Sequence, residues 1–500
     1  MSQKKYGVIL SYLSEGVRIL TGLIYTPVML RILGDVEYGL YQLVASTIAY
    51  LSLLNLGFTG AYTRYYTKAK SESQDSVAKL NGMFMSLFLV MSLICIACGV
   101  ALILNAEAFF GNKLSPENYS EAKVLIAILI LSMALSFPTS VFSCNISANE
   151  RFTFERGITL LQNILNPFLC LPVLLMGYGN VGVVLVSFVL TLLKLIVSCF
   201  YCIKRIGMKF CFRGFDVEVF KSMSSFTFFI FINQIIDQVN WNLDKYLLGR
   251  FASLSAIAVY GVGSQLNALY ISCSNSISSV FAPQINRIAI NEKDDNLLSD
   301  IFVRVGRVQY IVVFLVLSGF FFFGKKFIFL WTGDTYHDSY YVAIALMIPM
   351  LVPLIQNIGI EIQRAKNRHQ VRSIVYFVMA VVNAGISIPL IMNFGAVGAA
   401  LGTTISLILG NIIFMNIYYH LKLNIDIIGF WKSIFHMLPA SIVVCILAYC
   451  IATVFTGETW IVLLIEIFVY CFCYMVVFWL LALNTYEKAL IRKAIKKIRK

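Results

Sequence analysis

One stretch of the chain combines ionisable and amide side chains with enough apolar residues to cross a bilayer. It runs from Phe226 to Arg250 and reads FTFFIFINQIIDQVNWNLDKYLLGR. Residues spaced by four, three and four share one helical face, and beside them lies a second polar stripe. The first face holds Asn233, Asp237, Asn240 and Asp244, and the second holds Gln234, Gln238, Trp241 and Lys245. Such groups are costly in lipid, so we expect this helix to line an aqueous cavity.

Within that cavity wall, Asp237 is the carboxylate nearest the middle of the segment. It could bind a coupling ion or a proton, or it could be hydrogen-bonded to helix neighbours, which is the slightly favoured interpretation. Asn233 and Trp241 are the expected substrate contacts beside it.

A second polar face lies in the first apolar segment, where Ser11, Glu15, Arg18, Gly22 and Tyr25 share one side of a helix. Glu15 and Arg18 are close enough to pair. The pair could neutralise itself and fix helix packing. Alternatively, Arg18 could receive an anionic group while Glu15 orients it, and the arginine fork suits phosphate because it donates two hydrogen bonds at once.

Three more polar residues are candidate substrate contacts. Lys194 has no carboxylate within one helical turn, so it either snorkels or faces the cavity. The segment centred near residue 268 carries hydroxyls and amides that suit either sugar hydroxyls or helix packing. Packing is the favoured role for most of them, and Gln265 and Asn275 are the candidates for binding.

Other charged positions have simpler interpretations. Lys245 is expected to snorkel to the interface, and Glu361 is expected to pair with Arg364. The C-terminus TYEKALIRKAIKKIRK gathers apolar residues on one helical face among basic ones, so it predicts a short helix lying on anionic lipid. A solvated basic tail is the alternative.

The elements that position these residues are membrane helices. The 500-residue chain is 59% hydrophobic and 13% charged, with a mean hydropathy of +0.82, which indicates an all-α polytopic membrane protein. Hydropathy predicts about 14 transmembrane helices. Tight turns at Gly177–Gly179 and Asn393–Gly395 join two pairs of them into hairpins.

The basic residues set the predicted orientation. About 30 of the 39 Lys and Arg residues fall in the termini and in loops after even-numbered helices, and about 6 fall in the other loops. Both termini are therefore expected in the cytoplasm and the loop Asn105–Glu121 outside. The net charge of +14 is spread over many short loops, which argues against nucleic acid as a partner.

The sequence also repeats itself. Asn166, Pro172 and Ala148 match residues 217 positions later, Gly182 matches Gly398, and Arg31 and Tyr41 match residues 219 positions later. The prediction is two six-helix lobes in a parallel pseudo-two-fold repeat, with the substrate cavity between them. The expected domains are an N-lobe (1–217), a C-lobe (218–430), two further helices (431–486) and a basic cytoplasmic tail (487–500).

The sequence carries no Walker loop, no metal-ligand cluster and no nucleophile motif. Its C-x-x-C pairs lie inside apolar segments, where cysteine is a small packing residue. We therefore expect a transporter and not an enzyme, with no cofactor, no metal and a monomeric state.

Several segments together resemble a known family: YGLYQLV, LLNLGFTGAYTRYYTK, LDKYLLGR followed by AVYGVGSQL, and FGAVGAALGTTIS. They are similar to the polysaccharide-transport (Wzx-like flippase) branch of the multidrug/oligosaccharidyl-lipid/polysaccharide exporter superfamily. The resemblance covers almost the whole chain. It implies alternating access in a bacterial inner membrane and an undecaprenyl-diphosphate-linked glycan as cargo. Arg18 lies where the lipid II flippase branch also has a cavity arginine, but the further arginines of that branch are missing on the eighth helix.

Three alternatives differ in what they require. A cation-coupled multidrug antiporter of the same fold needs an acidic cavity, which Glu15 and Asp237 could supply. A polymerase needs a large external loop, and a major-facilitator transporter usually carries a Gly/Asp/Arg motif after its second helix. The sequence has neither feature.

Overall fold

The protein is described by a computed structural model covering residues 3–111, 114–213, 217–289, 294–366, 368, 370–485 and 487–489. The described residues form helices and no strands, which confirms the all-α class. The chain divides into two compact units, Met1–Ala258 and Val259–Lys500. Each unit is described by itself.

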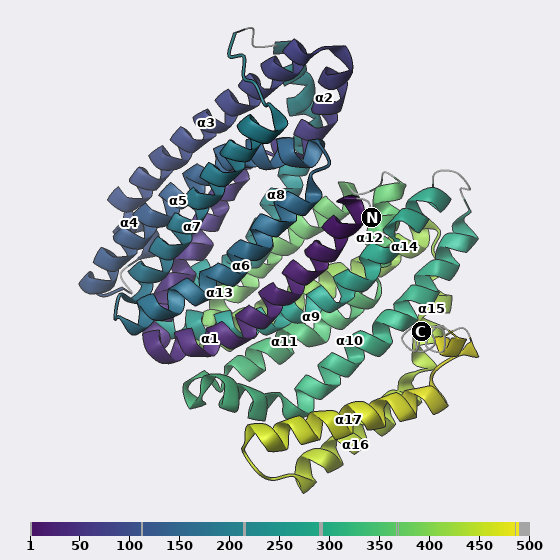
Figure 1. The fold of residues 1–500 in the computed structure, drawn as a ribbon. Coiled ribbons are helices and arrows are strands. Elements are labelled where there is room, and N and C mark those ends of the chain that lie inside the picture. Colours follow the sequence, from purple (N-terminus) through teal and green to yellow (C-terminus); the bar gives the residue numbers. More distant parts are fainter. Residues whose placement is uncertain are drawn as a thin grey trace. The chain divides into compact units, whose positions relative to one another are not determined.

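The first unit is built from long apolar helices joined by short segments. Its elements are α1 (Gln3–Ala49), η1 (Tyr50–Asn55), α2 (Phe58–Glu72), α3 (Gln74–Leu104), α4 (Ala106–Phe110), α5 (Pro116–Ala148), α6 (Phe152–Leu175), α7 (Gly179–Tyr201), η2 (Cys202–Ile206) and α8 (Val217–Phe251). In Figure 1, α3, α5 and α7 lie side by side, and α1 packs along α6. Because α8 packs on α1, α2 and η1, the compact unit extends past residue 217, where the repeat predicts a boundary.

The second unit begins within α9 (Leu254–Arg287). It continues with α10 (Asp295–Thr332), η4 (Asp334–Tyr336), α11 (Ser339–Ile355), α12 (Ile358–Ala365), α13 (Gln370–Leu407), η5 (Ile408–Phe414), α14 (Met415–Leu423), α15 (Ile427–Phe435), α16 (Leu438–Val454) and α17 (Trp460–Leu481). Figure 1 shows α16 and α17 in yellow beside α10, and both pack on it.

Ten of the described helices are long and apolar enough to cross a membrane, or up to 11 when the bent pair α15–α16 is one span. Two run for 60 and 54 residues, about 90 and 80 Å at the helical rise, whereas a bilayer core is about 30 Å thick. Each is interrupted by a glycine with positive φ, Gly34 (φ 79°) and Gly395 (φ 55°). Each is therefore two spans, and the total of about 14 stays a prediction.

Side-chain caps fix where several spans begin. Ser73 Oγ accepts from the Ser76 backbone N–H at 3.0 Å before α3, and Ser115 caps α5 ahead of a proline in its first turn. Asp294 caps α10, and Thr459 caps α17. Capping satisfies backbone donors that a membrane helix would otherwise leave without a partner.

The two predicted hairpins are present, and they make equivalent contacts. Asn166 Nδ2 donates to Ser187 Oγ at 3.1 Å in the first unit. In the second unit Asn383 Nδ2 donates to Thr403 Oγ1 at 3.2 Å. The turn glycines Gly179 and Gly395 have φ of 51° and 55°. An equivalent contact between residues offset by 217 and 216 positions supports the internal repeat.

Candidate functional site

The first half of α1 carries an exposed ion pair, as the spacing of Glu15 and Arg18 predicts. Arg18 Nε donates to Glu15 Oε2 at 3.0 Å and Arg18 Nη2 to Glu15 Oε1 at 2.5 Å. The Arg18 side chain is 58% exposed and that of Glu15 46%. Of the five N–H donors of an arginine, these contacts use two. The others are available to a ligand.

A contact with α6 holds this part of α1 in place. Asn163 Nδ2 donates to Ser14 Oγ at 3.0 Å, and Ser14 is buried at 6% exposure. Ser14 and Arg18 are one helical turn apart on the same face of α1, so the buried contact holds α1 against α6 next to the exposed Arg18 side chain. An exposed guanidinium is costly in lipid, so this face suits water or an anion.

A ladder of polar contacts joins α8 to the second span. Gln238 Nε2 donates to Ser52 Oγ of η1 at 3.0 Å, and Asn242 Nδ2 donates to Gln238 Oε1 at 2.6 Å. Lys245 Nζ donates to Gln42 Oε1 of α1 at 2.8 Å. The prediction that Lys245 snorkels is therefore wrong, because its ammonium group donates a hydrogen bond to Gln42 on a neighbouring helix.

The expected cavity face of α8 is only partly described. Asn233 and Asp237 belong to α8, but their side chains lie outside the described part of the chain. Asn240 donates to a carbonyl of its own helix at 2.9 Å, and Asp244 is 2% exposed. Trp241 is 54% exposed, which leaves its ring available to a ligand.

The other candidate residues lie on separate helices. Lys194 is half-buried on α7 of the first unit. On α9, Gln265 is half-buried and Asn275 is exposed. Asn275 Oδ1 accepts from Asn357 Nδ2 at 2.7 Å, so Asn275 takes part in a helix contact. No described contact joins Arg18, Lys194 and Trp241 into one cluster.

The serines of α9 serve helix packing, as expected for most of them. Ser274 Oγ donates to Leu354 O at 2.8 Å, and Gln309 Nε2 donates to Ser278 Oγ at 2.6 Å. Asn357 Nδ2 also donates to Ser274 Oγ, at 3.3 Å. These buried bonds hold α9 against α10 and the segment between α11 and α12.

Two buried ion pairs of the second unit were not predicted. Arg307 Nε donates to Glu487 Oε1 at 2.6 Å, and Arg307 Nη1 donates to Ser433 O at 2.9 Å. Lys326 Nζ donates to Glu466 Oε1 at 2.6 Å. The available signal was Glu466 itself, a carboxylate in the middle of the apolar run WIVLLIEIFVYCF that needs a buried cation.

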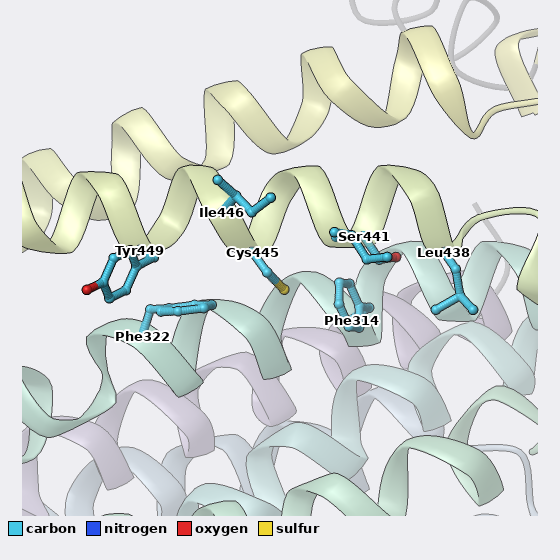
Figure 2. A pocket seen from close by; sticks show the side chains of 8 residues that line it. Phe314, Phe322, Leu438, Ser441, Cys445, Ile446 and Tyr449 are labelled. Atoms are coloured by element: carbon cyan, nitrogen blue, oxygen red, sulfur yellow. The ribbon is translucent and has the colours of Figure 1, made fainter.

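An apolar groove of about 470 Å³ lies between α10 and α16. Figure 2 shows Phe314 and Phe322 of α10 opposite Cys445 and Tyr449 of α16. The one hydroxyl near its middle, Ser441 Oγ, is already bonded to Tyr310 at 2.9 Å. The groove therefore offers apolar contact and little polar recognition.

Comparison with protein families gives one match over more than half of the chain. The family model described as "Polysaccharide biosynthesis protein" matches residues 5–289. The chain is 22% identical over 490 residues to "Uncharacterized membrane protein EpsK" of Bacillus subtilis (strain 168), covering 94% of each chain. It is 18% identical over 400 residues to "Putative O-antigen transporter" of Shigella flexneri, covering 78% of this chain and 91% of that protein.

Solved structures show the same fold at low identity. The inward closed conformation of the lipid II flippase MurJ superposes with a TM-score of 0.75 and 18% identity, covering 94% of this chain and 98% of that one. An inward-facing multidrug resistance MATE family transporter gives 0.60 and 12%, covering 85% and 95%. At these identities the likeness establishes the fold alone.

Proposed function

We propose that this chain, which belongs to the polysaccharide biosynthesis protein family, moves a lipid-linked oligosaccharide across the bacterial inner membrane. The glycan would serve cell-surface polysaccharide assembly. The relative named as a putative O-antigen transporter and the fold shared with a lipid II flippase support this class of cargo. The cargo we propose is an undecaprenyl-diphosphate-linked glycan, moved by alternating access. No catalytic step is part of the proposal.

The observation that carries the proposal is the exposed Arg18 on α1. Its side chain is 58% exposed although the surrounding helix is apolar enough to span a membrane. A diphosphate presents several oxygens to the unused N–H donors, and the planar fork can bind two at once. Glu15 holds the fork in one orientation before the ligand arrives.

The remaining candidates would contact the glycan. Trp241 offers an exposed ring on which a sugar face could stack, and Asn233, Gln265, Asn275 and Lys194 would donate to hydroxyls. We propose that both termini lie in the cytoplasm and that the basic tail lies on anionic lipid. Most of that tail, residues 490–500, is outside the described residues.

Asp237 is the proposed coupling residue, because it is the ionisable group nearest the middle of α8. One charge moved across the membrane is worth about 2.3 kcal/mol per 100 mV, enough to bias a two-state cycle more than tenfold. Asp237→Asn should preserve substrate binding and remove the dependence of flipping on pH or Na⁺ in proteoliposomes. Unchanged ion dependence would place the coupling elsewhere.

The deciding experiment measures flipping of a short-chain diphosphate-linked glycan in proteoliposomes. Hydrogen bonds to charged groups contribute about 1.5–3 kcal/mol, so Arg18→Ala should lower flipping roughly tenfold or more at equal protein amounts. Arg18→Lys should retain part of the rate because it keeps the charge without the fork.

The matched control is Arg364→Ala. Arg364 also pairs with a glutamate three residues away and is 63% exposed, but it lies on α12. The Arg364→Ala variant should flip the glycan at the rate of the unmodified protein. Full activity of Arg18→Ala would leave Arg18 with a packing role only and would refute the proposed diphosphate contact.

A further inference from the structure

Three chain turns meet at one end of the first unit. They are the kink of α1 after Gly34, the first turns of α5, and the turn between α6 and α7. Asn180 of α7 donates its Nδ2 to the Glu37 backbone O at 2.8 Å and to Glu121 Oε1 of α5 at 3.0 Å. A Cβ built on Gly179 would lie 3.4 Å from Glu37 Oε2. The Glu121 carboxylate therefore contacts the Asn180 amide, and the Glu37 carboxylate lies beside the neighbouring residue Gly179.

This cluster has more negative charge than its described contacts neutralise. Among the described residues, neither Glu37 nor Glu121 makes a salt bridge with lysine, arginine or histidine. The two carboxylates are close enough to interact with each other. Like charges at such a distance repel, and a shared cation removes that repulsion.

An independent observation concerns the amide of Asn180. The residue is 1% exposed, and its Oδ1 has no hydrogen-bond donor. Buried acceptors without a protein donor are uncommon and indicate an ordered water or an ion. The three turns thus bring together an amide oxygen without a donor, a backbone carbonyl and two half-buried carboxylates.

We propose that Glu37, Glu121 and Asn180 form a Ca²⁺ site that ties the three turns together. Calcium takes six to eight oxygen ligands and accepts carboxylates, amide oxygens, carbonyls and water together. The described residues contain no group of three His, Cys, Asp or Glu side chains that could hold a metal, so the site depends on the amide oxygen and on water. Few protein ligands and two charges fit the weak, millimolar class of calcium sites.

The site joins segments that are far apart in sequence, and each of them begins a membrane span. A bound cation would hold the start of α5 and α7 against the kinked end of α1, and it would act on the unit as a clamp. In the predicted topology this end lies outside the cytoplasm, where free Ca²⁺ reaches the concentrations that such a site needs.

The test uses the full-length protein in nanodiscs of zwitterionic lipid, so that headgroups do not bind the cation. Thermal unfolding is followed by tryptophan fluorescence while CaCl₂ replaces NaCl at constant ionic strength. The Tm should rise by a few degrees and saturate in the millimolar range, as mass action requires. Equilibrium dialysis with CaCl₂ should give one bound ion per chain.

Glu121→Gln should weaken calcium binding at least tenfold. Glu117→Gln is the control, because Glu117 is an exposed carboxylate in the first turn of the same helix, and it should behave like the unmodified protein. Equal binding by Glu121→Gln would overturn the proposal, as would no binding in dialysis or an equal Tm rise with MgCl₂.

Asn180→Asp separates the calcium site from a bound water without deleting a buried side chain. A third carboxylate should lower the Tm in chelator through repulsion, and added CaCl₂ should restore it at a lower concentration than the unmodified protein needs. A variant that is destabilised and stays so in CaCl₂ would show that the position holds only water.

Discussion

Ion pairs occur in both units of this protein, and they differ in how many hydrogen-bond donors remain unused. On α1 the Glu15–Arg18 pair is about half exposed and has unused N–H donors. In the second unit the Arg307–Glu487 side chains are only 6% and 3% exposed. Arg307 also donates to Ser433 and to the Ala482 carbonyl. The first pair has capacity for a ligand, and the second is saturated by its own protein.

The difference separates charges used for assembly from charges available for binding. A buried pair in which every donor has an acceptor stabilises one arrangement of helices and responds to nothing outside it. Glu487 also accepts from the Asn484 backbone N–H at 2.9 Å, and its own N–H donates to Asn484 Oδ1 at 2.9 Å. The Arg307 pair therefore anchors the segment after α17.

The largest expected effect comes from breaking the Arg307 pair. Glu487→Gln leaves the Arg307 guanidinium buried without its counter-charge, which costs about 3–5 kcal/mol in buried pairs. We expect a large drop in Tm and a loss of monodisperse protein in size-exclusion chromatography. A Tm within experimental error of the unmodified protein would contradict the assembly role.

A matched control lies on the same helix. Arg304 and Asp300 of α10 are 3.7 Å apart and 55% and 65% exposed. Exposed pairs contribute about 0–1 kcal/mol, so Asp300→Asn should leave the Tm nearly unchanged. Glu487→Gln and Asp300→Asn each remove one negative charge beside an arginine of α10. A difference between their Tm values therefore reports the effect of burial and not of net charge.

The Lys326–Glu466 pair should show a slightly smaller effect. Lys326 is 18% exposed and also donates to the Phe455 carbonyl at 3.1 Å, while Glu466 is fully buried. Glu466→Gln should lower the Tm because the ammonium group loses its counter-charge. The double change Lys326→Met with Glu466→Leu should recover most of the loss, since apolar replacement of a buried pair is often neutral. No recovery would mean that the individual hydrogen bonds matter more than the charge.

Sequence spacing predicted the pairs whose partners lie within one helical turn. Glu15–Arg18 and Glu361–Arg364 are both present, at 2.5 and 2.9 Å, because helical geometry alone brings residues three apart together. The partners of Arg307 and Lys326 are 180 and 140 residues away. Only tertiary packing selects such partners, and one sequence does not encode that choice in a readable pattern.

The same limit applies to Lys245 and to the hairpins. Proximity to a helix end predicted a snorkelling Lys245, but Gln42, which accepts from it, comes from a helix more than 200 residues earlier in the chain. The hairpins were predictable because glycine turns are local and the repeat offset places Asn383 where Asn166 stands. The resemblance to the polysaccharide-transport branch is confirmed by the family match over residues 5–289, since it relied on motifs along the whole chain.

A sharper comparison comes from separating stability and transport on α1. Glu15→Gln removes one charge of an exposed pair, so the free energy of unfolding should change by no more than about 1 kcal/mol. Arg18 would then keep its charge and one neutral hydrogen-bond acceptor in place of Glu15, so it should still bind a diphosphate. Flipping in proteoliposomes should persist in Glu15→Gln, whereas Arg18→Ala should lower it roughly tenfold or more. A purely structural pair would suffer equally from either change.

The smallest expected effect concerns the pair on α12. Glu361 and Arg364 share the spacing of the α1 pair, and the Arg364 side chain is similarly exposed at 63%. Pairs of this kind stabilise a helix by about 0.2–0.5 kcal/mol, so Glu361→Gln should barely move the Tm and should leave flipping unchanged. Comparing its flipping rate with those of Glu15→Gln and Arg18→Ala shows whether transport depends on the position of the pair on α1. The alternative is that any exposed pair at this spacing affects transport. If Glu361→Gln impaired flipping as strongly as Arg18→Ala, the role of Arg18 would be a general effect of helix surface charge and not recognition of an anion at α1.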